Sequence, residues 1–371
     1  MKKPTNEKNF NRRHVIPLLL ALVALALLPA GARAQALDVG WQLPGIGNAV
    51  AFSPDGQMVL AGNQLRQTAD GDLIRTFNLR HGSEVNAAAF SPDGQYAAIA
   101  VQASDLNLNF FRVSDGFRVA PTGAHHNGTT AANFSPDGKW VVTGGRDGTV
   151  KVWHVPDFTL VNTFLGGPGY GARVFAVLFS SDGQYLAVGG QGGVLILRVS
   201  NGETVRVLAD SSDTAQSLAF TPDGSTLAAG FFTTHQAGVF SVKLWRFSDG
   251  MLLKTIAASN QPINSVAFQP DAKVIASGGG DDQLSGVIRF FRVGDSAQLG
   301  YFPQDPNNGN SYVTSVAYSP NGQLIAYARA DRFVVVTRNP FLEGGIRGSE
   351  VGAEESQIEA TPVGPQQEAA D

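Results

Sequence analysis

Short apolar runs alternate with one recurring turn phrase along most of this chain. The phrase is an aromatic residue followed by Ser-Pro-Asp-Gly or a close variant, and its third residue falls at positions 54, 92, 136, 181, 222, 270 and 320. Proline presets the backbone at the second position of a type I turn, and glycine is favoured at the fourth. Apolar runs flank the phrase, as at 49–52 and 58–61. Two such runs around a turn predict a β-hairpin.

Each hairpin is followed in most units by two further apolar runs. Residues 242–245 are one example of a third run, Ser248-Asp249-Gly250 of a second turn, and residues 251–256 of a fourth run. Units of four strands that recur every 38 to 50 residues, without helical periodicity, predict propeller blades. We therefore expect an all-β fold, a single seven-bladed β-propeller of four-stranded antiparallel blades.

The two ends of the repeat predict how the ring closes. The last unit supplies three runs and then reaches Asn339-Pro340 without a convincing fourth strand. The segment Leu37 to Leu43 precedes the first unit, and we expect this N-terminal strand to close the last blade. The first unit is short, so its second and third strands are predicted to turn at Gly62-Asn63.

Residues 1–34 have the composition of a signal peptide. Basic residues precede an apolar run of 14 residues, Val15 to Leu28, which is short for a membrane span. Ala32-Arg33-Ala34 has the small-x-small form of a cleavage site, which predicts Gln35 as the mature start. Arg12-Arg13 loosely resembles a twin-arginine signal. We expect an exported protein, periplasmic or extracellular, with an uncleaved membrane anchor as the alternative.

Composition and charge restrict the remaining function classes. The chain has no cysteine, which excludes disulfides, zinc-thiolate sites and catalytic thiols. The formal net charge is −4, and the predicted signal peptide is itself basic, so the rest of the chain is more acidic. Nucleic acid is therefore not an expected partner. Residues 35–342 form the predicted propeller, and residues 343–371 are predicted to be a disordered acidic tail.

The units resemble WD-repeat propellers, and the third unit matches their pattern best. His125 stands at the position of the loop histidine, Thr143 at the strand hydroxyl, Asp147 at the turn aspartate and Trp153 at the strand-end indole. The resemblance implies that these four side chains form a hydrogen-bonded structural tetrad inside one blade. Other units keep fewer of these residues, and none ends in Trp-Asp. TolB-like periplasmic propellers have similar turn phrases and are the nearest alternative family.

No catalytic constellation, cofactor motif or dedicated metal site is recognisable. His125-His126 is explained by the tetrad, and Asp281-Asp282 lacks the further spaced acids of a calcium loop. We therefore expect a monomeric, non-enzymatic scaffold without a cofactor, which binds a protein or peptide. The alternatives are a propeller hydrolase or lactonase with its site at the central channel, and a TolB-like factor of cell-envelope assembly.

The partner is expected at one rim of the ring. This rim carries the loops that join second to third strands and one blade to the next. Tyrosine, phenylalanine and arginine are favoured interface anchors. The candidate partner-binding residues on these loops are Phe231, Phe232, Tyr301, Phe302, Tyr170, Arg80, Arg146 and Arg173. The alternative for each aromatic ring is that it packs beneath its own loop.

Overall fold

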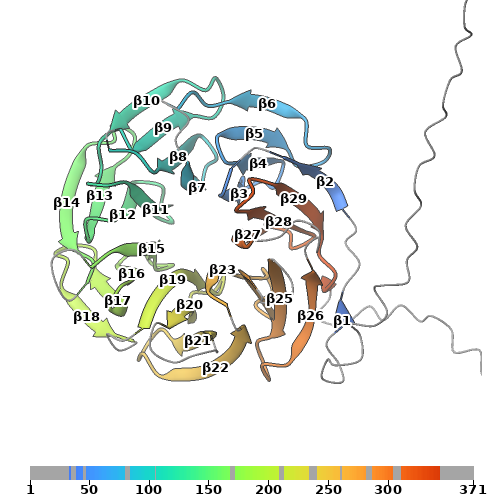
Figure 1. Cartoon of the computed structure of the whole chain (residues 1–371). Coiled ribbons are helices and arrows are strands. Elements are labelled where there is room, and N and C mark those ends of the chain that lie inside the picture. Colours follow the sequence, from blue (N-terminus) through green and yellow to red (C-terminus); the bar gives the residue numbers. More distant parts are fainter. Residues whose placement is uncertain are drawn as a thin grey trace, which may run out of the picture.

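The chain folds into a ring of seven small antiparallel sheets (Figure 1), as a computed structural model shows. The structure describes residues 33–34, 39–44, 47–79, 84–104, 106–167, 172–208, 213–233, 240–259, 261–280, 286–303 and 311–342. These residues contain no α-helix, so the predicted all-β fold and the seven four-stranded blades are confirmed. The predicted signal peptide, apart from its last two residues, and the acidic tail lie outside the described residues.

Each blade runs outward from the axis of the ring, so its first strand is innermost and its fourth strand outermost. The strands, blade by blade, are β3 (Val50–Phe52), β4 (Met58–Ala61), β5 (Gln64–Gln67) and β6 (Leu73–Thr76); β7 (Val85–Phe90), β8 (Tyr96–Val101), β9 (Leu108–Arg112) and β10 (Arg118–Thr122); β11 (Thr129–Phe134), β12 (Trp140–Gly145), β13 (Thr149–His154) and β14 (Leu160–Leu165); β15 (Val174–Phe179), β16 (Tyr185–Gly190), β17 (Gly193–Arg198) and β18 (Thr204–Val207); β19 (Asp213–Phe220), β20 (Thr226–Thr233), β21 (Phe240–Arg246) and β22 (Leu252–Ser259); β23 (Ile263–Phe268), β24 (Val274–Gly279), β25 (Val287–Arg292) and β26 (Gln298–Pro303); and β27 (Val313–Tyr318), β28 (Leu324–Arg329), β29 (Val334–Arg338) and β2 (Val39–Leu43).

The recurring phrase forms the turn between the first two strands of each blade. In blade 1 the backbone N–H of Gly56 donates to the carbonyl of Ser53 at 2.8 Å. The Ser53 hydroxyl donates to Asp55 at 2.5 Å and accepts from the N–H of Met58 at 2.9 Å. Blade 6 departs from the phrase, because Ala272 stands at the glycine position with φ of 59°. Alanine there adopts the left-handed conformation that favours glycine.

The N-terminal strand closes the ring, as predicted. Strand β2 lies antiparallel to β29 and completes blade 7. Trp41 is buried, and its indole Nε1–H donates to the carbonyl of Thr68 in blade 1 at 2.9 Å. One strand thus joins the last blade to the first. A two-residue strand, β1 (Arg33–Ala34), pairs in parallel with β26, so blade 6 carries a fifth strand that the sequence did not predict.

Apolar side chains pack between neighbouring blades, and the inner strands are joined by hydrogen bonds. The hydroxyl of Ser217 accepts the backbone N–H of Val266 from the next blade at 2.9 Å. Ser265 accepts the N–H of Val316 in the same way at 2.9 Å. Small polar residues on the innermost strands therefore hold adjacent blades in register around the axis.

Candidate functional site

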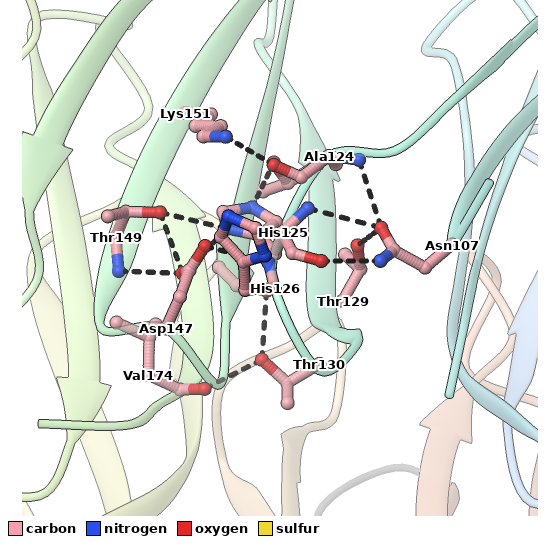
Figure 2. A network of polar contacts seen from close by, with 12 residues as sticks. Asn107, Ala124, His125, His126, Thr129, Thr130, Asp147, Thr149, Lys151 and Val174 are labelled. Carbon is pink, nitrogen blue, oxygen red and sulfur yellow. Dashed lines mark hydrogen bonds and ion pairs between the residues drawn. The ribbon is translucent and has the colours of Figure 1, made fainter. Parts of the chain in front are cut away.

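Blade 3 contains a buried polar network centred on His125 (Figure 2). Its Nδ1 lies 3.0 Å from Asp147 Oδ1 and 2.9 Å from Thr149 Oγ1. Its Nε2 lies 2.9 Å from Thr143 Oγ1, which also accepts the indole N–H of Trp153 at 3.0 Å. The structure thus brings His125, Thr143, Asp147 and Trp153 together, with Thr149 as an additional member.

The hydrogen bonds of this network define one arrangement of protons. The ionised carboxylate of Asp147 can only accept, so Nδ1–H of a neutral His125 donates towards it. The Nε2 of that neutral imidazole is then an acceptor, so the Thr143 hydroxyl donates to it, while the Thr143 oxygen accepts the Trp153 N–H. Burial lowers the pKa of His125 below its ordinary 6.5, against the opposing effect of Asp147. Burial alone would raise the pKa of Asp147, but hydrogen bonds from His125 and Thr149 outweigh it and hold that pKa below its ordinary 3.8.

A residue of blade 2 connects this network to the neighbouring loop. The side-chain oxygen of Asn107 accepts the hydroxyl of Thr129 at 2.8 Å and the backbone N–H groups of Ala124 and His125 at 3.0 and 3.2 Å. Its amide nitrogen donates to the carbonyl of His125 at 2.5 Å. Sequence reasoning missed Asn107, because it lies outside the motif and belongs to the preceding blade.

The network fixes loops at the rim. The His125 side chain is fully buried and that of Asp147 is 13% exposed, so both lie beneath the surface. The other carboxylate oxygen of Asp147 accepts the backbone N–H of His126 at 3.0 Å, which ties the loop between blades to the β12–β13 turn. These two segments belong to what we call the upper rim, the edge of the ring formed by loops between second and third strands and between blades. The network therefore positions Arg146, which directly precedes Asp147.

A polar pocket of about 430 Å³ opens on the upper rim where blades 2, 3 and 4 meet. It is lined by Gln102, Ala103, Ser104, Asn127, Arg146 and Arg173. Arg146 donates to the side-chain oxygen of Gln102 at 2.9 Å, across the boundary between blades 2 and 3. Gly128 has φ of 108°, a backbone conformation that is strained for a residue with a Cβ, so glycine suits this position in the loop beside Gln102.

The charge of this pocket is positive. None of its six lining residues is acidic, and within the described part of the chain neither Arg146 nor Arg173 forms an ion pair with a carboxylate. The nearby carboxylate of Asp147 is committed to His125 and Thr149. Two guanidinium groups with a serine and an asparagine around them suit an anionic group, because arginine presents planar donors that match carboxylate geometry.

Two aromatic residues expected at the rim are core residues, and the expectation that they are exposed was wrong. Phe231 is fully buried, packs edge-on against Trp245 at 6.1 Å and lies under Lys243, whose Nζ is 4.8 Å from the ring centroid. The reason is that β20 runs to Thr233 and takes in a segment that the sequence suggested was a loop. Phe302 is 1% exposed and packs edge-on against Phe290 at 5.0 Å, because β26 extends through it.

Phe231 also replaces the polar network in its own blade. Pairing with the first strand places Phe231 opposite Ala215, and Gly145 is the corresponding residue of β12. A Cβ on Gly145 would lie 2.2 Å from the His125 ring, so blade 3 needs glycine where it holds a histidine. Blade 5 instead fills the space with Phe231 and pairs Lys243 with Asp213 at 2.7 Å.

The remaining candidates are divided between half-buried and undescribed positions. Phe232 is partly buried and packs against Phe240 with ring centroids 5.8 Å apart. Tyr301 is partly buried in β26, where its backbone pairs with that of Ala34. Arg80 and Tyr170 lie outside the described residues. Of the predicted rim residues, Arg146 and Arg173 are therefore the two that the structure brings together in one pocket.

The described ranges contain neither a cluster of metal-ligating side chains nor a membrane-spanning helix. No three His, Cys, Asp or Glu side chains there come close enough together to hold a metal ion. No helix among those residues has the length and apolar character needed to cross a membrane.

The ring of blades and the buried polar network together define a β-propeller of the repeat type. The family model of the WD domain, G-beta repeat, matches residues 71–111, 119–154, 158–197, 250–285 and 304–336, which amount to half of the chain. The chain therefore belongs to the WD-repeat family.

Curated relatives match parts of the chain. Pre-mRNA-processing factor 19 of Oryza sativa is 31% identical over 44% of this chain and 31% of its own length. A WD repeat-containing protein of Synechocystis is 31% identical over 27% of this chain and 28% of its own. The target of rapamycin complex subunit LST8 of Saccharomyces cerevisiae is 25% identical over 34% of this chain and 41% of its own. The matches thus span less than half the length of each relative.

Proposed function

We propose that this chain is an exported, non-enzymatic scaffold that binds a protein or peptide partner at its upper rim. The observation that carries the proposal is the pocket in which Arg146 and Arg173 lie together without an acidic partner among the described residues. The partner would present a carboxylate, from an aspartate, a glutamate or a chain terminus, to these two guanidinium groups.

The architecture around the pocket supports a rigid binding surface. The loops that carry Asn127 and Arg146 are both tied to the buried network, through His125 and Asp147. A partner that binds such fixed loops loses little free energy to ordering them. Membership in the WD-repeat family supports an interaction role, and LST8 is itself named as the subunit of a complex.

Four polar residues of the innermost strands serve the fold, which favours the scaffold over an enzyme at the channel. Ser217, Ser265 and Ser315 each accept a backbone N–H of the neighbouring blade. On the inner strands Asn264 likewise donates to the carbonyl of Val313 at 3.0 Å. Side chains used in this way stabilise the contacts between blades.

Export is proposed from the N-terminal sequence. Residues 1–34 combine a basic start, an apolar run and an Ala-x-Ala site, as signal peptides do. In this proposal the mature scaffold starts at Gln35 and meets its partner in the periplasm or outside the cell. Amino-terminal sequencing of the protein recovered from each cell fraction tests this, and an intact Met1 in the cytoplasmic fraction would contradict it.

Cross-linking from the pocket tests the proposed function. The chain has no cysteine, so Ser104→Cys creates a single thiol on the pocket wall, to which a photoactivatable maleimide can be attached. Irradiation in an extract of the native compartment should yield a defined cross-linked protein, identified by mass spectrometry. The matched control is Asp93→Cys, on the hairpin turn at the opposite rim of the same blade.

The outcome is read from the difference between the two positions. A product formed from position 104 and lost when Arg146→Gln and Arg173→Gln are added supports the proposal. Equal products from both positions, or a product that is insensitive to the loss of both arginines, would contradict the proposed rim site.

A further inference from the structure

In every blade the outermost strand has a β-bulge where it pairs with the third strand. The bulge falls at the equivalent position in all seven blades, near the end of the third strand. We call the residue that follows the bulge and resumes pairing the post-bulge residue. In blade 4, for example, Thr204 pairs with Leu197 and Arg206 pairs with Ile196, so Arg206 follows the bulge. The post-bulge residues of blades 1 to 7 are Arg75, Ala120, Asn162, Arg206, Lys254, Gly300 and Trp41.

At three boundaries the post-bulge residue is a cation that reaches the next blade. Arg75 donates to the carbonyl of Ser114 at 2.7 Å, and Arg206 donates to the carbonyl of Ser248 at 2.6 Å. Lys254 donates to the carbonyl of Val293 at 2.7 Å. The acceptors all lie just after the third strand of the following blade. A charged donor thus spans the groove between blades 1 and 2, 4 and 5, and 5 and 6.

At three other boundaries an aromatic ring fills the groove. Trp41 is itself the post-bulge residue between blades 7 and 1. Where the post-bulge residue is small, the next blade supplies the ring. Phe158 stacks on Phe110 at 4.0 Å beside the position of Ala120, and Phe341 packs on Phe290 at 4.9 Å beside that of Gly300. Both phenylalanines are buried.

The boundary between blades 3 and 4 has neither arrangement. Its post-bulge residue is Asn162, whose side chain has no hydrogen-bond partner among the described residues. The ring of Phe164 packs against Gly202 of blade 4, but a cavity of about 430 Å³ remains in the groove between the two blades. Its lining includes Trp140, Val152, Val161, Arg198, Val199 and Ser200. Val199 and Ser200 occupy the positions of Phe247 and Ser248, whose carbonyls bind Arg206 in blade 4.

A second groove is larger and yet bridged, so the two grooves differ in the crossing side chain and not in volume. The groove between blades 1 and 2 measures about 510 Å³, and its lining includes Arg75 and Ser114, the two residues joined across it. Asparagine is too short to make the same crossing. The carbonyls of Val199 and Ser200 consequently receive no donor from the described part of the chain.

We propose that the groove between blades 3 and 4 binds an arginine side chain of a partner polypeptide. The guanidinium would donate to the carbonyls of Val199 and Ser200, as Arg206 does to the equivalent carbonyls one blade later. The aliphatic stem would lie along Val152 and Val161, beside Trp140, which also lines the groove.

Arg198 is the one charged side chain in the lining of this groove. It forms an exposed ion pair with Glu203, whose carboxylate lies 3.4 Å away, and its guanidinium lies 5.7 Å from the centre of the Tyr185 ring. The ion pair reduces the repulsion between Arg198 and a guanidinium ligand but does not remove it, so the carbonyls of Val199 and Ser200 must carry the recognition. The groove includes Gly183 and Gln184 from the hairpin turn of blade 4. It therefore lies towards the edge of the ring opposite the upper rim. It is distinct from the upper-rim pocket, and the inference does not depend on the proposed function.

The test is a titration observed at one indole. The chain has four tryptophans, and Trp140→Phe assigns the Trp140 Nε1–H signal in a two-dimensional NMR spectrum. The probe is N-acetyl-arginine amide. N-acetyl-phenylalanine amide is titrated separately, to test whether the groove instead prefers an apolar side chain. Asn162→Arg places an arginine of the chain's own in the groove and should block the probe; we call it the filled variant. Asn162→Lys is a second filled variant, to be used if the first does not fold. Thr163→Arg is the matched control, because it adds the same charge on the exposed face of the same strand.

The expected result is a saturable shift of the Trp140 signal with the arginine probe. The apparent affinity should fall at least about tenfold in Asn162→Arg or Asn162→Lys and stay unchanged in Thr163→Arg. The inference is overturned if the arginine probe gives no saturable shift, if the filled variants respond like the natural chain, or if only the phenylalanine probe binds.

Discussion

The guanidinium of Arg206 crosses from blade 4 to blade 5 and donates to the carbonyl of Ser248 at 2.6 Å. The residue in the same register one blade earlier is Asn162, which ends short of the corresponding carbonyl of Ser200. The length of one side chain therefore decides whether a blade boundary is bridged. Six of the seven boundaries are bridged or filled by one residue, and each such residue adds to the stability of the ring.

Asn162→Arg is predicted to stabilise the protein. A new hydrogen bond from a charged group to the Ser200 carbonyl, with the stem of the side chain packed in the groove, contributes about 1 kcal/mol. For a domain of this size the melting temperature should rise by roughly 1–2 °C in thermal unfolding followed by circular dichroism. Arg206→Ala should change it by a similar amount in the opposite direction. A melting temperature that falls in Asn162→Arg would contradict the equivalence of the two positions.

Stability should depend on pH through His125. Because burial holds the pKa of His125 below 6.5, the unfolded chain takes up a proton before the folded chain does. The free energy of unfolding is therefore greatest above pH 6.5 and falls as the pH drops below it, by up to about 1.4 kcal/mol per pH unit. Asp147 adds to this loss only near and below pH 3.8, since its pKa is also lowered.

The measurement is the free energy of unfolding in urea between about pH 7.5 and pH 5.5. His125→Asn should lower stability at every pH and flatten the profile in this range. His154→Gln is the control, because His154 is an exposed histidine paired with Asp157 at 3.0 Å. A profile that remains equally steep in His125→Asn would show that another group is responsible.

Phe231→Ala is predicted to destabilise the fold without weakening partner binding. The ring is fully buried against Trp245, and removing such a side chain costs about 3–5 kcal/mol. Phe231 lies in blade 5, and it is not among the residues that line the pocket of Arg146 and Arg173. Denaturant unfolding measures the first effect, and the yield of cross-linking from position 104 measures the second. If Phe231→Ala kept the stability of the natural chain and lost the cross-link, Phe231 would be a partner-binding residue and not a core residue.

Ala272→Gly should stabilise the protein by about 1 kcal/mol. Alanine has φ of 59° there, and the left-handed conformation costs about 1–2 kcal/mol for a residue with a Cβ. Glycine removes that cost, partly offset by the greater entropy of the unfolded chain. The control is Gly322→Ala in the corresponding turn of blade 7, where φ is 71°, and the change should be destabilising. Two melting temperatures that move in the same direction would be inconsistent with this explanation.

The fold could be predicted from the sequence because its information is local and repeated. The phrase around Ser53 encodes a complete turn, with its own side-chain hydrogen bonds, within six residues. Seven copies of a local signal define seven hairpins and the ring. The closing strand could be predicted by counting, since the last unit supplied three strands and a spare apolar segment preceded the first.

The site could be predicted only in part, because it depends on the register between blades. Asn107 contacts the loop of His125 across a blade boundary, and no motif marks that contact. The extents of β20 and β26 decide that Phe231 and Phe302 are buried, and strand ends in long loops are poorly encoded in the sequence. The pairing of Arg146 with Arg173 in one pocket, and the gap at Asn162, follow from how adjacent blades meet.

The most direct test of the account is the affinity of the upper rim for an acidic peptide. A fluorescein-labelled hexaglutamate peptide, titrated with the protein and followed by anisotropy, should bind saturably and more weakly as salt is added. The Arg146→Gln, Arg173→Gln double variant should bind at least about tenfold more weakly. Arg292→Gln, which removes an exposed arginine paired with Asp295 at 2.8 Å, should bind as the natural chain does. Equal affinities of the natural chain and the double variant would contradict the claim that this rim recognises an acidic partner.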